Sequence, residues 1–228
     1  MDDLFSQPTL KQLALSRAEV EALVGKPHTV VECDLGGADL SGLDLSQWSF
    51  EKCDLRQADF HGARLERSKW RSCRAAFASF VGCDLSEASF ANSDFNNVAL
   101  KRSNLNGAKI VGCKFTGADL TDIRGMEVRF EETLLINTKM PGRDFRKAKL
   151  TRLDFSQADL RKCDFRHATF NECSLRDALL DGARFDGADL RGADLGGVQL
   201  GDASQFRGAT ISSQQATQLL KELGLKVR

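Results

Sequence analysis

Seven cysteines are the residues of this 228-residue sequence whose type and spacing could carry chemistry. They are Cys33, Cys53, Cys73, Cys83, Cys113, Cys163 and Cys173, and five of them (33, 53, 73, 113 and 173) differ by multiples of 20. Such a stack could form a metal ladder or a redox stack, but metal ligands converge and usually include histidine. Ser93, Thr133, Leu153 and Ala193 share the same spacing, so we predict a position that selects a small packed side chain. An odd number of cysteines without a CxxC pair indicates free thiols in a reducing cytosol.

Histidines and aspartates are the other candidates for catalysis. The histidines are His28, His61 and His167, and the last two project from different sides of the repeat described below, several coils apart. The sequence contains no Walker loop, HExxH or GxSxG motif. Aspartates precede leucine or phenylalanine too regularly to be catalytic, and we interpret them as outward, solvated side chains. We therefore predict that the protein is not an enzyme, and that it has no catalytic, cofactor-binding or metal-binding residue.

A five-residue repeat must position all of these residues. Of the 35 positions divisible by five from Val30 to Leu200, 34 hold an apolar residue and Gly125 is the exception. The position two residues earlier is also selective, mostly for small residues, and it holds all seven cysteines. Neither a straight helix nor a straight strand can bury a period of five on one side. The pattern fits short extended segments whose small and large residues point inward, followed by two residues that turn a corner.

The copies "ADLSG", "ADFHG", "ADLTD" and "ADLRG" resemble the pentapeptide-repeat family over residues 30–207. The resemblance implies an all-β fold, a right-handed quadrilateral β-helix with four pentapeptides per coil and short α-helical caps at both ends. About 8–9 coils at a strand spacing of ~4.8 Å would form a rod ~40 Å long.

The ends of the solenoid need caps, because they expose apolar side chains and strand edges. We assign residues 1–29 to an N-terminal segment whose capping helix opens at Ser16-x-x-Glu19 and ends at Gly25. Residues 208–228 form a C-terminal capping helix and tail, with Ser212 or Ser213 as N-cap. The repeat is irregular at 121–145, which is either a kink or a partner-contact loop.

Composition and charge narrow the class of protein. The 32 basic residues balance 32 acidic ones, which gives no reason to expect binding to nucleic acid or to a membrane. The N-terminus has no signal-peptide pattern and no apolar run could span a membrane. We predict a cytoplasmic location.

The tail "ISSQQATQLLKELGL" resembles the quinolone-resistance members of the family. This resemblance implies that the protein binds DNA gyrase or topoisomerase IV as a partial mimic of DNA and protects the enzyme from quinolones or peptide antibiotics. It also implies a homodimer through the C-terminal end. The expected dimer contact consists of Ala216, Leu219, Leu220 and Leu223. The alternative is a rigid scaffold for a different protein partner, and a third interpretation, an injected effector, has no support in the N-terminus.

The charges of the repeat body limit how closely it could mimic DNA. Residues 30–207 hold 27 acidic and 26 basic residues, whereas B-DNA carries one charge per ~1.7 Å. The two most acidic sides adjoin, and their candidate partner-facing residues are Asp34, Asp54, Asp94, Asp154 and Asp194 on one and Asp39, Asp59, Asp119 and Asp159 on the other. Basic residues interrupt both sides, namely Arg74, Lys101, Arg102, Lys114, Arg161 and Lys162. The expected acidic stripe is therefore patchy.

Overall fold

A computed structural model describes residues 8–198, 203–222 and 224–227 of the chain. The chain divides into two compact units, unit 1 (Met1–Arg129) and unit 2 (Phe130–Arg228). The division falls within residues 121–145, the segment whose repeat is least regular. Each unit is described by itself below.

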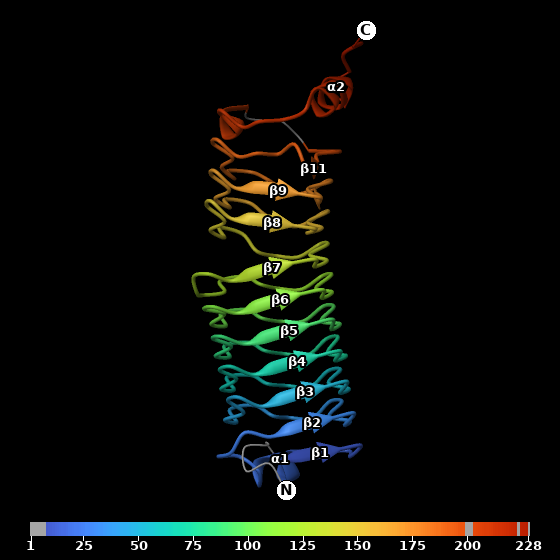
Figure 1. Ribbon diagram of the computed structural model, residues 1–228, viewed down its shortest axis with the longest axis vertical. Helices are drawn as coiled ribbons and strands as arrows, with labels where there is room; N and C mark the ends of the chain where they lie inside the picture. Colours follow the sequence, from blue (N-terminus) through green and yellow to red (C-terminus); the bar gives the residue numbers. More distant parts are fainter. Residues whose placement is uncertain (1–7, 199–202, 223, 228) are drawn as a thin grey trace, which may run out of the picture. The chain divides into compact units, whose positions relative to one another are not determined.

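Unit 1 is a solenoid of short parallel strands, one on the same side of each successive coil. Its strands are β1 (Thr9–Lys11), β2 (Thr29–Val31), β3 (Ser49–Glu51), β4 (Lys69–Arg71), β5 (Ser89–Ala91) and β6 (Lys109–Val111). Each pairs with the next in parallel, so that Val30 lies beside Phe50 and Phe50 beside Trp70. Figure 1 shows β2 to β6 side by side in one ladder. The middle residue of each of β2 to β6 points inward and is buried, because side chains alternate along a strand.

Three further ladders complete each coil. Single parallel bridges join Asp34 to Asp54, Asp39 to Asp59, and Asp44 to Arg64. The bridged positions recur at every fifth residue along the chain, and each bridge joins equivalent positions of two successive coils. Together with the strand ladder they give the coils of unit 1 from Thr29 onward four extended sides, which confirms the predicted quadrilateral β-helix.

The core of unit 1 is a stack of large side chains alternating with small ones. The rings of Phe50 and Trp70 lie parallel with centroids 4.3 Å apart, and those of Phe60 and Phe80 are 4.7 Å apart. Because equivalent residues lie one strand spacing apart, flat rings stack on their own kind with little loss of contact. The predicted inward register is confirmed by burial of the positions divisible by five from Val30 to Leu120.

Each corner needs a left-handed backbone conformation at its second residue. This position has positive φ in coil after coil, for example 69° at Gly42, 64° at Gln47 and 61° at Gln57. A side chain in this region costs roughly 1–2 kcal/mol relative to the right-handed region. The corners therefore favour glycine or a polar residue that remains in water.

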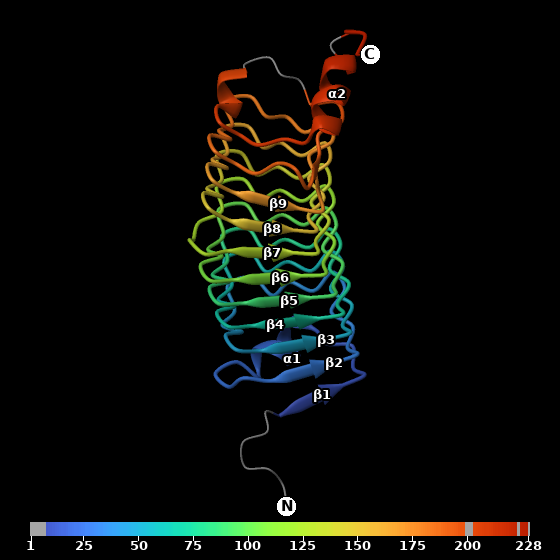
Figure 2. The ribbon, with the colours of Figure 1, turned by 45° about the horizontal axis from the view of Figure 1, so that its top comes forward.

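Unit 2 repeats the same coil. Its ladder consists of β7 (Arg129–Glu131), in which unit 1 ends, β8 (Lys149–Thr151) and β9 (Thr169–Asn171), and a second side pairs β10 (Cys173–Ser174) with β11 (Ala193–Asp194). The ring of Phe165 stacks between Phe145 at 5.0 Å and Phe185 at 4.9 Å. Figure 2 shows the strands of this ladder in a second view.

The last coil of unit 2 holds one additional residue. Asp189 pairs with Thr210, whereas the regular register would pair it with Ala209. A short 3-10 helix, η1 (Ala203–Phe206), precedes this bridge, and the ring of Phe206 stacks on Phe185 at 4.8 Å. Phe206 thus takes the inward place that position 205 would hold in the regular repeat.

The first coil begins earlier than residue 30. Strand β1 lies inside the range that we assigned to an N-terminal segment, and it pairs with β2 in the same register as the later strands. Helix α1 (Arg17–Glu21) follows β1, and Ser16 and Glu19 form the predicted capping box. The helix ends well before Gly25, because it occupies a side of a coil whose length is fixed by the β1–β2 register. Val20 of this helix is fully buried.

Helix α2 (Ser213–Glu222) follows the last coil of unit 2. Ser212 is its N-cap: the Gln215 amide donates to Ser212 Oγ at 3.2 Å, and the Ser212 amide donates to Gln215 Oε1 at 2.6 Å. After the helix, Gly224 adopts a φ of 82°, and the Leu225 amide donates to the Leu220 carbonyl, as expected for a glycine stop.

The inward register of unit 2 can be tested at Phe165. We expect Phe165→Asp to unfold unit 2, because an unpaired charge between two stacked rings costs several kcal/mol. The measurement is a thermal melt followed by circular dichroism. Phe165→Leu is the control, since leucine fills equivalent sites such as Leu160 and Leu190, and it should lower the melting temperature only moderately. An unchanged melt of the aspartate variant would contradict the register.

Candidate functional site: the acidic sides of the solenoid

The nine candidate partner-facing aspartates all form a hydrogen bond that stabilises the next corner of the coil. In each, Oδ1 accepts a hydrogen bond from the backbone amide two residues later, at 2.9–3.3 Å. This is an Asx turn, in which the aspartate imitates a backbone carbonyl at the start of a turn. The pairs are Asp34–Gly36, Asp39–Ser41, Asp54–Arg56, Asp59–His61, Asp94–Asn96, Asp119–Thr121, Asp154–Ser156, Asp159–Arg161 and Asp194–Gly196. Our interpretation of these residues as merely solvated was incomplete, because each also fixes the backbone.

Within each unit, the structure places these aspartates on two adjoining sides. In unit 1, parallel bridges join Asp34, Asp54, Arg74 and Asp94 along one side, and Asp39, Asp59 and Ser79 along the next. In unit 2 the equivalent bridges join Asp154 to Ser174 and Asp159 to Leu179, and β10 pairs Ser174 with Asp194. In unit 1, Asp34 and Asp54 on one side and Asp39 and Asp59 on the next are therefore neighbours at the strand spacing of ~4.8 Å. In unit 2, Ser174 separates Asp154 from Asp194.

Arginines neutralise several of these carboxylates. Asp54 is bonded by Arg56 at 2.6 Å and by Arg74 at 3.1 Å, and only 12% of its side chain is exposed. Asp159 pairs with Arg161 at 2.7 Å, and Asp194 pairs with Arg176 at 2.7 Å. Asp39 pairs with Arg17 of α1 at 3.0 Å. Within the described residues, Asp34, Asp59, Asp94 and Asp154 have no ion-pair partner, and three of these four carboxylates lie in unit 1.

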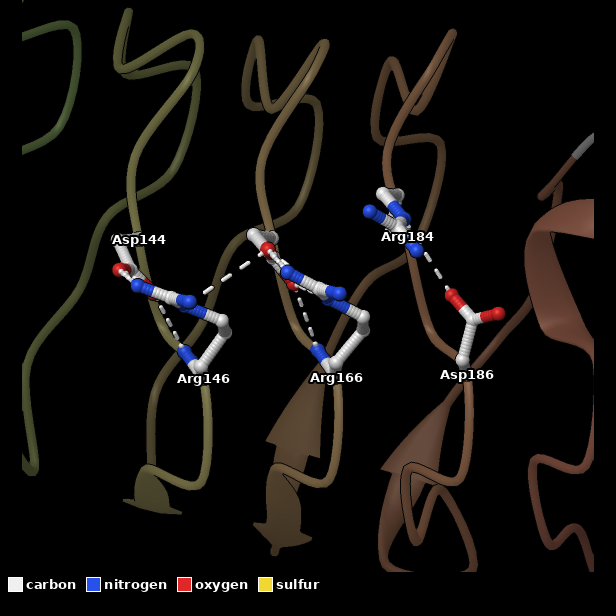
Figure 3. A network of polar contacts seen from close by, with 6 residues as sticks. Asp144, Arg146, Arg166, Arg184 and Asp186 are labelled. Carbon is white, nitrogen blue, oxygen red and sulfur yellow. Dashed lines mark hydrogen bonds and ion pairs between the residues drawn. The ribbon is translucent and has the colours of Figure 1, made fainter.

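A recurring Asp-x-Arg pair explains much of this neutralisation. In "DLR" and "DFR" the arginine follows the aspartate by two residues and returns two N–H groups to its carboxylate. Figure 3 shows this fork on a third side of unit 2, where Arg146 holds Asp144 at 2.6 Å and Arg166 holds its aspartate in the same way. In the same column Arg184 and Asp186 stand in the reverse order, 3.5 Å apart. The two-residue spacing is visible in the sequence, but we did not connect it with ion pairs there.

The cysteines pack in the core of the coils, and their thiols also form hydrogen bonds. All seven thiols are buried, and several of them donate to backbone carbonyls inside the coil. Cys53 Sγ lies 3.3 Å from the Val30 carbonyl oxygen, and Cys73 Sγ lies 3.3 Å from that of Phe50. Ser103 uses its hydroxyl in the same way toward Phe80, at 3.2 Å. The position therefore accommodates small side chains, and those that carry a donor use it on a carbonyl inside the coil.

Cys83, Cys113 and Cys163 are poor nucleophiles. Burial raises the pKa of Cys83 and Cys163 to about 12 and that of Cys113 to about 11. The attacking species is the thiolate, which these values suppress at neutral pH. One surface hollow of about 360 Å³ is lined by Gly82, Cys83, Asp84, Asn104 and Arg124. Its thiol is one of those kept protonated.

A metal-binding cluster and a membrane-spanning helix are both absent from the parts of the chain that the structure describes. No group of three or more His, Cys, Asp or Glu side chains is arranged to hold a metal ion among residues 8–198, 203–222 and 224–227. Within the same ranges, no helix combines the length and apolar character that a membrane crossing requires.

The four residues that we predicted as a dimer contact on helix α2 differ in how far they are buried. Leu219 is buried, and Ala216 is half-buried. Leu220 is 40% exposed. Leu223 lies outside the described residues. The anchor that sequence reasoning missed is Gln215, whose Nε2 donates to the carbonyls of Leu190 and Ala193, both at 2.7 Å.

The irregular positions of segment 121–145 have local causes. Gly125 has a φ of 113°, and a Cβ there would lie 2.4 Å from the Asn106 amide nitrogen, so only glycine fits. Met126, the next residue, is 79% exposed. In unit 2, Leu134 is 37% exposed at an outward site, and Arg143 occupies a small-residue site. Burial lowers the pKa of Arg143.

The coil geometry and the repeat define a class of protein: a β-solenoid built from five-residue units. The chain matches the family profile described as pentapeptide repeats, in eight copies, over residues 33–69, 73–122, 129–166 and 158–197. These matches cover more than half of the chain, which therefore belongs to the pentapeptide repeat family.

Solved structures share the fold. HetL, a pentapeptide repeat protein involved in heterocyst differentiation regulation from the cyanobacterium Nostoc sp. strain PCC 7120, is 20% identical with a TM-score of 0.68, over 86% of this chain and 94% of HetL. QnrB1, a plasmid-mediated fluoroquinolone resistance protein, is 22% identical in one trypsin-treated form, with a TM-score of 0.57 over 97% of this chain and 98% of QnrB1. Full-length QnrB1 gives 21% identity and a TM-score of 0.52, over 95% and 100%. A search of curated proteins found no match.

Acid should destabilise the protein through the corner carboxylates. Hydrogen bonds from the neighbouring arginines lower the pKa of Asp159 and Asp164, and lower that of Asp189 to about 2. A carboxyl group whose pKa is lower in the folded state contributes stability that is complete above its unfolded value and is lost as the pH falls through its folded value. The melting temperature should therefore fall between about pH 4 and pH 2.

The variant that tests this combines Asp159→Asn, Asp164→Asn and Asp189→Asn. The asparagine oxygen can still accept the corner hydrogen bond, as Asn104 does from the Asn106 amide at 3.1 Å. We expect lower stability than the wild type at pH 7 but a smaller loss between pH 5 and pH 2, measured by thermal melts. Glu172→Gln combined with Asp177→Asn and Asp181→Asn removes the same charge without touching a corner bond. An equal acid sensitivity in wild type and variant would refute the assignment.

Proposed function

We propose that this protein is a non-enzymatic binding protein and that its partner is a type II topoisomerase, DNA gyrase or topoisomerase IV. The observation that carries the proposal is the pair of carboxylate columns on adjoining sides of unit 1. Each carboxylate there is fixed by a hydrogen bond to its own corner, so binding a basic surface costs little side-chain entropy. QnrB1, which shares the fold, is described as a fluoroquinolone resistance protein, and its likeness supports a protein of the same class.

The proposed contact is a partial imitation of DNA rather than a complete one. Asp34, Asp59 and Asp94 present charges without an ion-pair partner in the described residues, whereas Asp54 lies between two arginines. Such a surface offers a local acidic patch that steers a basic protein groove, because fixed charges of one sign raise the rate of encounter. Protection against quinolones or peptide antibiotics would follow from occupying the surface that DNA needs.

The alternative function is a scaffold for a different protein. The ion pairs at Asp54, Asp159 and Asp194 favour it, because they give the two sides a mixed charge that suits a partner other than a DNA-binding groove. In both proposals the protein is cytoplasmic and non-enzymatic, and it binds neither nucleic acid nor a membrane directly.

DNA supercoiling by purified gyrase, titrated with this protein in the presence and absence of a quinolone, tests the topoisomerase proposal. We expect inhibition without the drug, or rescue from it, at micromolar protein. Asp59→Asn with Asp94→Asn should raise the required concentration at least about fivefold, because the charges that no arginine offsets are lost while the corner bonds remain.

The matched control changes two aspartates on the third side of the same unit. Asp44→Asn with Asp84→Asn removes the same charge from residues that also hold corners, at 3.1 Å and 3.0 Å to the amides two residues later. This control should behave as the wild type does. No effect of the wild type at tens of micromolar would refute a topoisomerase partner and leave the scaffold function.

We also propose that the protein is a homodimer through its C-terminal end. Leu220 is 40% exposed on α2, and Leu225, in the segment after the helix, is 55% exposed. Exposed leucines on the outer surface of a terminal helix suit a two-fold contact in which the same surface serves both copies.

Leu220→Asp tests this contact. We expect a monomer by light scattering at a concentration where the wild type is a dimer, with an unchanged melting temperature, because the side chain is not part of the core of unit 2. Gln214→Asp, an exposed position on the same helix, is the control for charge and should leave the mass unchanged. A dimer that persists with Leu220→Asp would rule out this contact.

A further inference from the structure

Phe77 breaks the rule that governs the corners. It occupies the second corner residue with a φ of 62°, and 62% of it is exposed. Among the described residues, every other non-glycine residue with positive φ is polar: glutamine, glutamate, lysine, arginine, serine, asparagine, aspartate or histidine. The equivalent residues in the coils on either side, Gln57 and Asn97, follow the rule.

The coil itself gives no reason for an aromatic residue at this place. The Phe77 amide donates to the Asn96 carbonyl at 2.9 Å, a bond that any residue except proline could make. Within the described part of the chain its ring stacks on none of the core rings, which lie inside the coil. A bulky side chain with positive φ is a rare conformation, and such positions gather at functional sites.

The residues around Phe77 leave its ring exposed to solvent. The corner lies between the two acidic sides, and the nearest outward residues on the following side are small, since Ser79 pairs with Ala99. Asp59 and Asp94 lie one coil to either side, and both are half-buried carboxylates held at their own corners at 2.9 Å and 3.0 Å. Arg74 on the same coil and Arg56 one coil before it both pair with Asp54, so the ring has charged groups of both signs around it. An exposed ring with a charged rim is the arrangement of an interface anchor.

We propose that Phe77 is the anchor of the partner contact, and that it inserts into an apolar pocket of the partner protein bordered by lysine or arginine side chains. The inference rests on the proposed function, because it takes the topoisomerase as the partner and names the residue at the centre of its contact. Burial of the ring supplies affinity, and the flanking carboxylates pair with the basic border of the pocket.

Binding of the full-length protein to purified gyrase, measured by biolayer interferometry at fixed salt, tests this anchor. Phe77→Gln restores the residue type found at the neighbouring corner, so we expect an unchanged or higher melting temperature together with at least about tenfold weaker binding. Phe77→Tyr keeps the ring and should stay within about threefold of the wild type. Leu179→Gln removes another exposed apolar side chain, 51% exposed and on an outward site of unit 2, and should not change the affinity.

The outcomes separate the two proposals. Wild-type binding that Phe77→Gln weakens, while Leu179→Gln does not, supports the anchor. Wild-type binding that Phe77→Gln leaves unchanged overturns the anchor while the topoisomerase partner stands. A fall in melting temperature with Phe77→Gln, with affinity unchanged for the folded fraction, shows a structural role and also overturns the anchor. Absence of wild-type binding overturns the topoisomerase partner, and the anchor with it.

Discussion

The backbone hydrogen bond between neighbouring coils is the interaction on which the structure depends. The Leu35 amide donates to the Asp54 carbonyl at 2.7 Å, and the Asp54 amide donates to the Cys33 carbonyl at 2.9 Å. These bonds recur in the same register from coil to coil only where successive coils have the same number of residues and turn their corners at the same places. The strict five-residue period, the left-handed corner residues and the small inward position all follow from that requirement. The side chains fill a cross-section that the backbone has already set.

The corner aspartates connect this requirement with the surface. A carboxylate at the outward site of a side satisfies the amide of the next corner, so the fold itself selects aspartate at many outward positions. An acidic column is therefore partly a by-product of building corners, and its functional weight depends on which carboxylates lack a neighbouring arginine. The Asp-x-Arg forks in Figure 3 show how the chain keeps the corner and cancels the charge. Asp59 and Asp94 form no ion pair in the part of the chain that the structure describes. Their charges are therefore available to a partner, unlike those in the forks.

Much of the fold could be predicted from the sequence, because the period is a direct record of the coil. The inward register, the capping box at Ser16 and the N-cap at Ser212 were all visible as local patterns. Strand β1 was not, since Thr9–Lys11 lacks the small-Asp-Leu signature and is recognised only by its pairing with β2. The anchoring of α2 by Gln215 depends on carbonyls of an earlier coil, which no local pattern reports. At the candidate site the columns followed from counting coil by coil, whereas the neutralising arginines and the exposure of Phe77 required the arrangement of side chains in space.

The additional residue in the last coil has a consequence for how long the repeat can continue. A solenoid of identical coils has no feature that ends the repeat, and the unpaired strand edge of its last coil can pair with another strand. The pairing of Thr210 with Asp189 is one residue out of step with every earlier bridge, which is a dislocation in an otherwise regular lattice. A following coil in the original five-residue phase would place its large apolar residues beside outward sites of this coil such as Thr210. Such a coil would lose either its strand pairing or its buried core, so the shifted register is incompatible with a further coil of the regular repeat.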